Sequence, residues 1–155
     1  AATDRLSLDP ERLTALIDHY QRPVPALVFN EVVREMAHAS IDISDGLIAD
    51  LGHIATSSEV AITVLLDQIP LSAAAQSWMD GRVDALDALR ILATGGDDYE
   101  IALTIPARLE TSLRTAAERL HLRITAIGRV EAGQGVTATC GGVGVDMPTP
   151  GWVHG

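Results

Sequence analysis

Apolar residues recur along the chain at two different spacings, which distinguish helices from strands. Helical spacing predicts helices over residues 10–20, 28–38, 47–55, 73–80, 83–93 and 108–120. Apolar–polar alternation predicts strands over residues 40–43, 60–66, 99–105, 123–129, 135–139 and 143–146. Because helices and strands alternate, we expect a sheet covered by helices. Glycines separate the last strands and favour antiparallel pairing there, so the expected fold class is α+β with a mixed sheet.

Residue types that begin and end helices support several of these boundaries. Asp9 stands at an N-cap position and Pro10 at the first helical position. Ser72 is placed to cap the helix that follows it, and Gly81 is placed to end that helix. The first helix carries an apolar stripe of Leu13, Leu16, Ile17 and Tyr20.

The most informative stretch reads as a short strand, a glycine turn and a helix. Ile41 and Ile43 alternate with Asp42 and Ser44, so one face is apolar and the other carries oxygen atoms. Ser44 or Asp45 is placed to cap the helix that follows. The turn therefore gathers two carboxylates and a hydroxyl between a strand and a helix.

This set of oxygens suits a magnesium–phosphate site. Carboxylate and hydroxyl oxygens are hard ligands of the kind that Mg²⁺ prefers, and the amides at a helix N-terminus suit phosphate oxygens. The alternative interpretation is that Asp45 only caps the helix and Asp42 is only solvated. The local pattern leaves both interpretations open.

A second unusual stretch is Gly95–Gly96–Asp97–Asp98, directly before a predicted strand. Paired glycines let the backbone turn tightly or approach a ligand closely. Adjacent acids at a strand start are unfavourable unless something compensates their charge. The alternative is an ordinary turn, since glycine and aspartate are common turn residues. Trp152, in a proline-rich C-terminal segment, is either a packing anchor or a residue that stacks on a ligand.

Composition limits the classes of function. The chain has 155 residues, 47% of them hydrophobic, which is enough for one compact domain with a core. Its formal net charge is −10 and its 11 basic residues are all arginines. The absence of lysine excludes a P-loop, and the acidic balance argues against a nucleic-acid surface. An acidic protein that binds phosphate needs another source of positive charge, and a bound divalent cation would supply it.

Other features of the sequence bear on its setting. Cys140 is the single cysteine, so the chain forms no internal disulfide, and we expect a reduced, cytoplasmic location. No apolar run approaches the length of a membrane span, and no signal peptide opens the sequence. Because the first residue is Ala1 rather than Met, we expect a fragment or a processed chain.

Four motifs, taken in chain order, resemble those of thiamine-monophosphate kinases. They are Asp-Ile-Ser-Asp-Gly-Leu at 42–47, Gly-Gly-Asp-Asp-Tyr-Glu at 95–100, Ile-Gly-Arg-Val at 127–130 and Gly-Trp-Val-His at 151–154. The wider superfamily is similar to aminoimidazole ribonucleotide synthetase and selenophosphate synthetase. The resemblance implies that residues 1–155 form a single three-layer α/β/α domain, like the C-terminal domain of aminoimidazole ribonucleotide synthetase. It also implies that an N-terminal domain carrying most of the ATP site is absent from this chain.

The resemblance implies a reaction and a role for each motif residue. The reaction is ATP-dependent phosphorylation of thiamine monophosphate to thiamine diphosphate with Mg²⁺. Asp42 and Asp45 would bind Mg²⁺, Ser44 would contact an ATP phosphate, and Asp97 and Trp152 would contact the substrate. Asp97 replaces a glutamate that is usual in the family. No residue is assigned as a catalytic base, because the acceptor is already a phosphate.

The resemblance also implies that the full-length protein is a homodimer and that this chain alone is inactive. The sequence is also consistent with two other functions. One is another ATP-binding member of the same superfamily, similar to aminoimidazole ribonucleotide synthetase or selenophosphate synthetase and acting on an amide or selenide substrate. The other is a non-catalytic assembly domain whose acidic turn is only structural.

Overall fold

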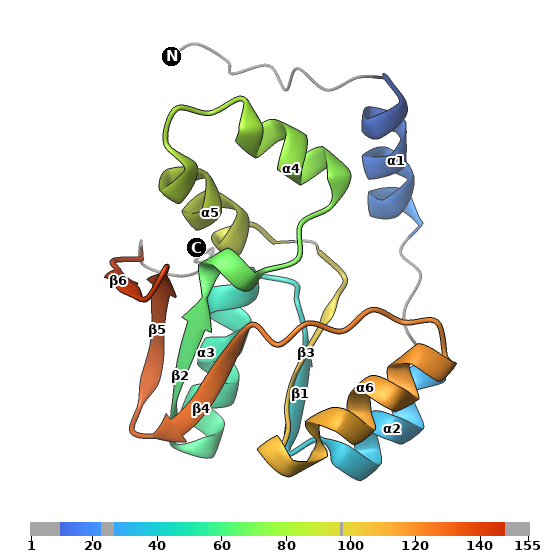
Figure 1. The fold of residues 1–155 in the computed structure, drawn as a ribbon, viewed down its shortest axis with the longest axis vertical. Helices are drawn as coiled ribbons and strands as arrows, with labels where there is room; N and C mark the ends of the chain where they lie inside the picture. The colour runs from blue at the N-terminus through green and yellow to red at the C-terminus, as the bar shows by residue number, and fades with distance from the viewer. Residues whose placement is uncertain (1–9, 23–26, 97, 148–155) are drawn as a thin grey trace, which may run out of the picture.

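The structure, a computed structural model, describes residues 10–22, 27–96 and 98–147 (Figure 1). Its helices are α1 (Pro10–Gln21), α2 (Asn30–Met36), α3 (Leu47–Ser58), α4 (Ala73–Asp80), α5 (Ala85–Thr94) and α6 (Glu110–Arg119), with short 3₁₀ turns at Leu27–Phe29, Leu66–Gln68 and Ala107–Leu109. Its strands are β1 (Ala39–Asp42), β2 (Val60–Leu65), β3 (Ile101–Thr104), β4 (Gly128–Ala132), β5 (Gly135–Cys140) and β6 (Val143–Val145). None of these described helices is long and apolar enough to cross a membrane.

The strands form two sheets. β1 and β3 pair antiparallel, with Asp42 opposite Ile101. The second sheet has four strands in the order β4-β2-β5-β6. Within it β2 runs parallel to β5, whereas the β2–β4 and β5–β6 pairs are antiparallel. The prediction of a mixed sheet with antiparallel pairing near its end is confirmed.

The main core lies where α3 packs against the strands. It contains the apolar face of α3, with Leu47, Leu51 and Ile54, as the spacing predicts. β2 contributes Ile62 and Val64, which alternate along the strand and are both buried. The pattern in residues 47–66 therefore predicts which side chains face the core.

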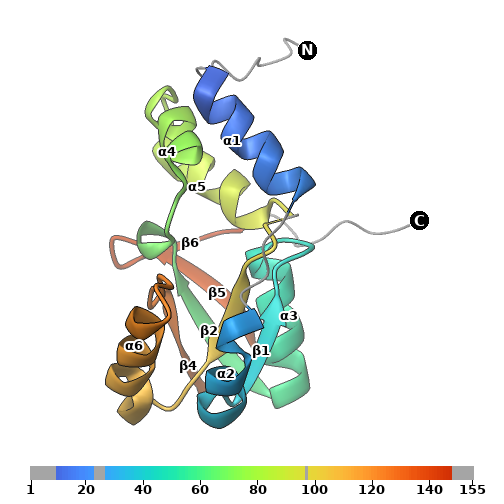
Figure 2. The same cartoon turned by 90° about the vertical axis from the view of Figure 1, so that its right-hand side faces the viewer.

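A smaller core lies on the other side of β3. Phe29, Leu113 and Ala117 are buried there, with Leu103 of β3 packed against them. The β1–β3 pair thus lies between α3 on one side and α2 and α6 on the other (Figure 2), and the four-stranded sheet packs on α3. This arrangement confirms the predicted α+β, three-layer α/β/α architecture.

Helix α1 forms as predicted from Pro10, but its apolar stripe is not buried in the described part of the chain. Leu13, Ile17 and Tyr20 are 44%, 47% and 59% exposed. The helix contacts α4, and the Tyr20 ring lies 6.5 Å from the ring of Tyr99, between centroids. The predicted cap, Asp9, lies outside the described residues.

Two predicted strands have the wrong boundaries. The strand predicted over 123–129 does not form over 123–127; β4 begins at Gly128, which pairs with Val64. A Cβ atom at Gly128 would clash with the Thr63 carbonyl oxygen, so this close approach to β2 depends on glycine. The strand predicted over 99–105 begins only at Ile101, because Tyr99 has a left-handed φ of 55°.

Candidate functional site

The predicted site lies in the turn between β1 and α3. β1 ends at Asp42 and α3 begins at Leu47, so Ser44 and Asp45 lie between them, as the sequence predicts. Ile43 anchors the turn, because its side chain is buried and its backbone is paired. Its N–H donates to the Glu100 carbonyl at 2.8 Å, and its carbonyl accepts from the Tyr99 N–H at 3.2 Å. The two motifs, at 42–47 and 95–100, are therefore neighbours in space.

Two glycines bring the backbones of these motifs into direct contact. Gly46 has a φ of 113°, and a Cβ there would lie 2.7 Å from the Thr94 carbonyl oxygen. A Cβ at Gly96 would clash with the Ser44 carbonyl oxygen. Gly46 requires glycine for its positive φ and for the lack of space, whereas Gly96 requires it only for the lack of space. The sequence predicts a tight turn or a close approach to a ligand at the Gly95–Gly96 pair, and in the structure the group that Gly96 approaches is the backbone of the other motif.

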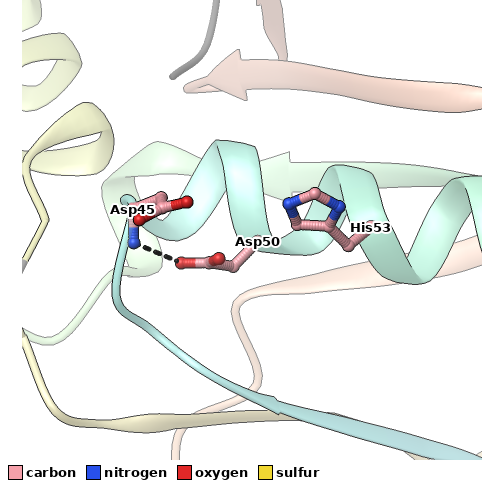
Figure 3. Close-up of side chains that lie close together, drawn as sticks. All are labelled: Asp45, Asp50 and His53. Carbon is pink, nitrogen blue, oxygen red and sulfur yellow. Dashed lines mark hydrogen bonds between the residues drawn. The ribbon is translucent and has the colours of Figure 1, made fainter. Parts of the chain in front are cut away.

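Asp50 fixes the turn from inside the helix. Its side chain is 2% exposed, and its Oδ2 accepts hydrogen bonds from the Ser44 N–H at 2.9 Å and the Asp45 N–H at 3.1 Å. Figure 3 shows the second of these bonds reaching back from α3 to the turn. A buried carboxylate is tolerated when such donors satisfy it, and hydrogen bonds to a charged group are strong.

This arrangement corrects the predicted cap of α3. The N-cap residue is Gly46 and makes no side-chain cap hydrogen bond, so neither Ser44 nor Asp45 caps the helix. The Ser44 and Asp45 amides already donate to Asp50, so they are not free to bind a phosphate oxygen. The interpretation of Asp45 as only a helix cap is therefore wrong. The side chains of the turn are left available for other partners.

Asp42, Ser44 and Asp45, the three residues that the sequence places at this site, are all exposed. The structure gathers Asp45 with Asp50 and the exposed His53, whose ligand atoms all lie within 4.8 Å of one another (Figure 3). His53 follows Asp50 by three positions in α3, which puts both on one side of the helix. Asp42 is not a member of this group.

The group offers two carboxylates and an imidazole to a cation. Carboxylates this close repel each other, and a bound divalent ion would offset that repulsion. The oxygens fit Mg²⁺ and the imidazole nitrogen suits softer divalent ions such as Mn²⁺ or Zn²⁺. Sequence reasoning missed Asp50 and His53. The available signal was an aspartate on the buried face of an amphipathic helix, three residues before a histidine.

Asp97 and Trp152, the two predicted substrate contacts, lie outside the described residues. The neighbouring Asp98 has its carbonyl oxygen 3.1 Å from Nε2 of His19 in α1. The predicted contacts of Asp97 and Trp152 with the substrate stay predictions.

Residues 5–141 match the family described as AIR synthase related protein, C-terminal domain. The chain belongs to this family. It is 36% identical to the thiamine-monophosphate kinase of Caulobacter vibrioides over 91% of this chain and 40% of that protein. It is also 36% identical to the thiamine-monophosphate kinase of Salmonella typhimurium, over 90% of this chain and 42% of that protein.

Solved structures of thiamine-monophosphate kinases are also similar to this chain. A thiamine-monophosphate kinase from Stenotrophomonas maltophilia K279a matches with a TM-score of 0.74 and 38% identity, over 89% of this chain and 42% of its own. A structure described as AaThiL complexed with AMPPCP and TMP matches with a TM-score of 0.71 and 33% identity, over 95% of this chain and 43% of its own. The resemblance to thiamine-monophosphate kinases is thus confirmed. The chain spans about two fifths of the length of these relatives.

Proposed function

We propose that this chain is the C-terminal part of a thiamine-monophosphate kinase. Such an enzyme transfers a phosphoryl group from ATP to thiamine monophosphate and forms thiamine diphosphate and ADP. The names of the relatives support this reaction, and so does the neighbour described with AMPPCP and TMP. The observation that carries the proposal is the exposed position of Asp42 at the end of β1 and of Ser44 and Asp45 in the next turn, which the Asp50 carboxylate holds through the amides of Ser44 and Asp45.

This turn has the chemistry that phosphoryl transfer requires. The reaction depends mainly on positioning the phosphates and neutralising their charge, rather than on covalent chemistry by the protein. Asp42 and Asp45 would hold Mg²⁺, which supplies the positive charge that an acidic chain lacks. The Ser44 hydroxyl would donate to a phosphate oxygen of ATP. Asp50 keeps the turn in one conformation before the nucleotide arrives.

Asp97 and Trp152 are proposed to contact the substrate. Thiamine carries a flat cationic thiazolium ring, and an indole face attracts such a cation by about 0.5–2 kcal/mol. The carboxylate of Asp97 is one methylene shorter than a glutamate and reaches less far. No catalytic base is proposed, since the accepting phosphate is already anionic.

The remainder of such a kinase is proposed to complete the ATP site. We propose that an N-terminal domain packs on this chain, that the full-length protein is a homodimer, and that this chain alone is inactive. The exposed apolar stripe of α1 supports a packing surface of this kind. The cytoplasmic location stays a prediction.

Ligand-induced stabilisation tests the proposal directly. A ligand that binds the native state raises its melting temperature by mass action. The melting temperature would be measured with Mg²⁺, AMPPCP and thiamine monophosphate, singly and together. We expect a Mg²⁺-dependent nucleotide shift that Asp45→Asn removes and a thiamine-monophosphate shift that Trp152→Ala removes.

The matched control is Asp18→Asn, which changes an aspartate whose side chain is 68% exposed on α1. It should leave both shifts unchanged. Shifts with the amide substrate of aminoimidazole ribonucleotide synthetase or with selenide, and none with thiamine monophosphate, would contradict the proposed substrate. The absence of any shift, in this chain and in a full-length protein that contains it, would favour a non-catalytic assembly domain.

A further inference from the structure

Helix α1 ends beside the segment that follows the Gly95–Gly96 pair (Figure 2). Nε2 of His19 lies 3.1 Å from the carbonyl oxygen of Asp98, 79 positions later in the sequence. Because a carbonyl oxygen can only accept, Nε2 carries a proton and donates in this bond. At the next position of the helix, the Tyr20 ring lies 6.5 Å from the Tyr99 ring, between centroids. Two consecutive side chains of α1 thus contact two consecutive residues of the second motif.

Tyr99 has a backbone conformation that its residue type disfavours. Its φ of 55° lies in the left-handed region, which is unfavourable for a residue with a Cβ atom. In the described part of the chain, the other non-glycine residues with a positive φ are Glu59 and His121. They lie at or directly after the C-caps of α3 and α6, where a left-handed residue is common. Tyr99 ends no helix, so contacts with the surrounding structure must keep its backbone in this conformation.

This strained residue lies between α1 and the candidate site. On one side, the Tyr99 N–H donates to the carbonyl oxygen of Ile43 at 3.2 Å, and Ile43 directly precedes Ser44. On the other side are the Tyr20 ring and the bond from His19 to the preceding carbonyl. A relaxation of Tyr99 out of the left-handed region would turn its N–H away from Ile43. The two contacts from α1 oppose this relaxation.

Burial does not account for the position of α1. None of its residues is buried, and Tyr20 is 59% exposed. Since hydrophobic stabilisation follows the apolar area removed from water, this helix adds little to the core. Its last turn nevertheless places a hydrogen-bond donor and an aromatic ring against the strained segment.

We propose that His19 and Tyr20 are positioning residues for the magnesium–phosphate turn. They hold residues 98–99, whose bond to Ile43 in turn supports the backbone that presents residues 44–45. Asp50 fixes the same turn from α3, so the turn is supported from both sides. The inference rests on the proposed function, since it takes this turn as the metal and phosphate site. It adds two residues of a separate helix that do not touch the ligands themselves.

Hydrogen exchange of the Tyr99 amide measures whether α1 holds this segment. The ¹⁵N-labelled chain would be compared with His19→Ala and Tyr20→Ala, each of which removes one contact. We expect protection of this amide to fall by at least about fivefold in each variant, as the loss of one net hydrogen bond or ring contact implies. His19→Gln and Tyr20→Phe should restore most of the protection. Glutamine still has an N–H to donate, and phenylalanine keeps the ring.

Mn²⁺ binding measures whether this support matters for the site. The affinity of each variant for Mn²⁺ would be followed through the broadening of NMR signals from the turn at 44–46. We expect His19→Ala and Tyr20→Ala to weaken binding by at least about threefold, because a less ordered turn must be ordered when the ion binds. His19→Gln and Tyr20→Phe should bind Mn²⁺ nearly as well as the unaltered chain. A helix with a merely structural role would leave the affinity unchanged in all four variants.

Asp18→Asn is the matched control in the same turn of α1. The Asp18 side chain is 68% exposed and is paired with Arg22. This variant should leave both the protection of Tyr99 and the Mn²⁺ affinity unchanged. Asp45→Asn is the complementary control, because it removes a proposed ligand and should abolish Mn²⁺ binding without lowering the protection of Tyr99. The dispersion of the amide spectrum reports whether each variant is folded.

The outcomes separate this inference from the proposed function. The positioning role is overturned if the two alanine variants leave the protection of Tyr99 unchanged, or if they lower it without weakening Mn²⁺ binding. If Mn²⁺ binding that depends on Asp45 is present in either case, the proposed function stands without this role. Absence of Mn²⁺ binding, in this chain and in a full-length protein that contains it, overturns both.

Discussion

Oδ2 of Asp50 lies 2.9 Å from the main-chain nitrogen of Ser44 and accepts its hydrogen bond. The same oxygen accepts from Asp45, so one buried carboxylate satisfies two consecutive amides of the turn. The exposed residues Ser44 and Asp45 are thus positioned by the buried residue Asp50. This relationship makes Asp50 a positioning residue for the proposed site.

Replacing Asp50 with alanine should therefore destabilise the protein. The change leaves two amides without their acceptor, and we expect the free energy of unfolding to fall by about 2–4 kcal/mol. Asp50→Asn keeps an acceptor oxygen and should lower the free energy of unfolding by less than Asp50→Ala does. Urea unfolding measures both, with His53→Ala as an exposed control on the same helix. Equal stability of Asp50→Ala and the unaltered chain would contradict the role given to this carboxylate.

The glycine contacts make a separate prediction. Gly96→Ala places a Cβ against the Ser44 carbonyl oxygen, a backbone atom that cannot move alone, and should cost about 1–3 kcal/mol. Gly52 is the control, because it lies in α3 and a Cβ added there would meet no atom within 4 Å. Gly52→Ala should stabilise the protein by about 0.5–1 kcal/mol. Thermal unfolding of both variants measures these changes in stability. If Gly96→Ala leaves the stability unchanged, the two backbones separate easily and the prediction is wrong.

Cation binding distinguishes two sets of ligands at the turn. The sequence predicts Asp42 and Asp45, whereas the structure gathers Asp45, Asp50 and His53. Mn²⁺ broadens the NMR signals of nearby nuclei, so it serves as the probe. We expect Asp45→Asn to weaken Mn²⁺ binding at least tenfold. If His53→Gln abolishes Mn²⁺ binding and Asp42→Asn does not, the ligands are Asp45, Asp50 and His53. If Asp42→Asn abolishes binding and His53→Gln does not, the ligands are Asp42 and Asp45.

The exposed face of α1 should contribute little to the stability of this chain. Ile17→Ser removes a side chain that is already 47% exposed, so the unfolding free energy should change by less than about 0.5 kcal/mol. Leu51→Ala, in the buried core, should cost about 2–5 kcal/mol. In a full-length protein the proposed packing of an N-terminal domain should make Ile17→Ser destabilising. Chemical unfolding of both forms of the protein measures the difference.

Asp67 should make a small contribution to the free energy of unfolding that depends on pH in the acid range. The Gln68 side chain and then the Gly141 N–H donate to its carboxylate, and they lower the pKa of Asp67 below the ordinary value of 3.8. Since the folded-state pKa is the lower one, this contribution is complete above 3.8 and is lost as the pH falls through the folded-state value. Melting temperatures of the unaltered chain and Asp67→Asn should therefore converge in acid. A constant difference would contradict the assignment.

Local periodicity predicted much of the fold. The order of strand, turn and helix around Asp42, the buried face of β2 and the Ser72 cap are local properties, and each is present. The Ser72 side chain accepts from the Ala75 N–H at 3.1 Å. The exposed position of Asp42 at the end of β1, and of Ser44 and Asp45 in the turn that follows, also agrees with the sequence pattern.

The parts that could not be predicted depend on contacts between distant segments. Whether the stripe of α1 is buried depends on what packs against it, and periodicity reports only that the stripe exists. The start of β4 depends on the approach of Gly128 to Thr63. The hydrogen bonds of Asp50 depend on the path of the turn, which Gly46 and Gly96 set through contacts made across about 50 residues of sequence.

Each of these two glycines makes room for the main chain of the other motif. A side chain at either position would require the opposite segment to retreat, and that movement would displace the turn that presents Ser44 and Asp45. Substitutions in the two motifs are therefore constrained jointly. A side chain at either glycine is therefore tolerated only if the opposite segment changes with it.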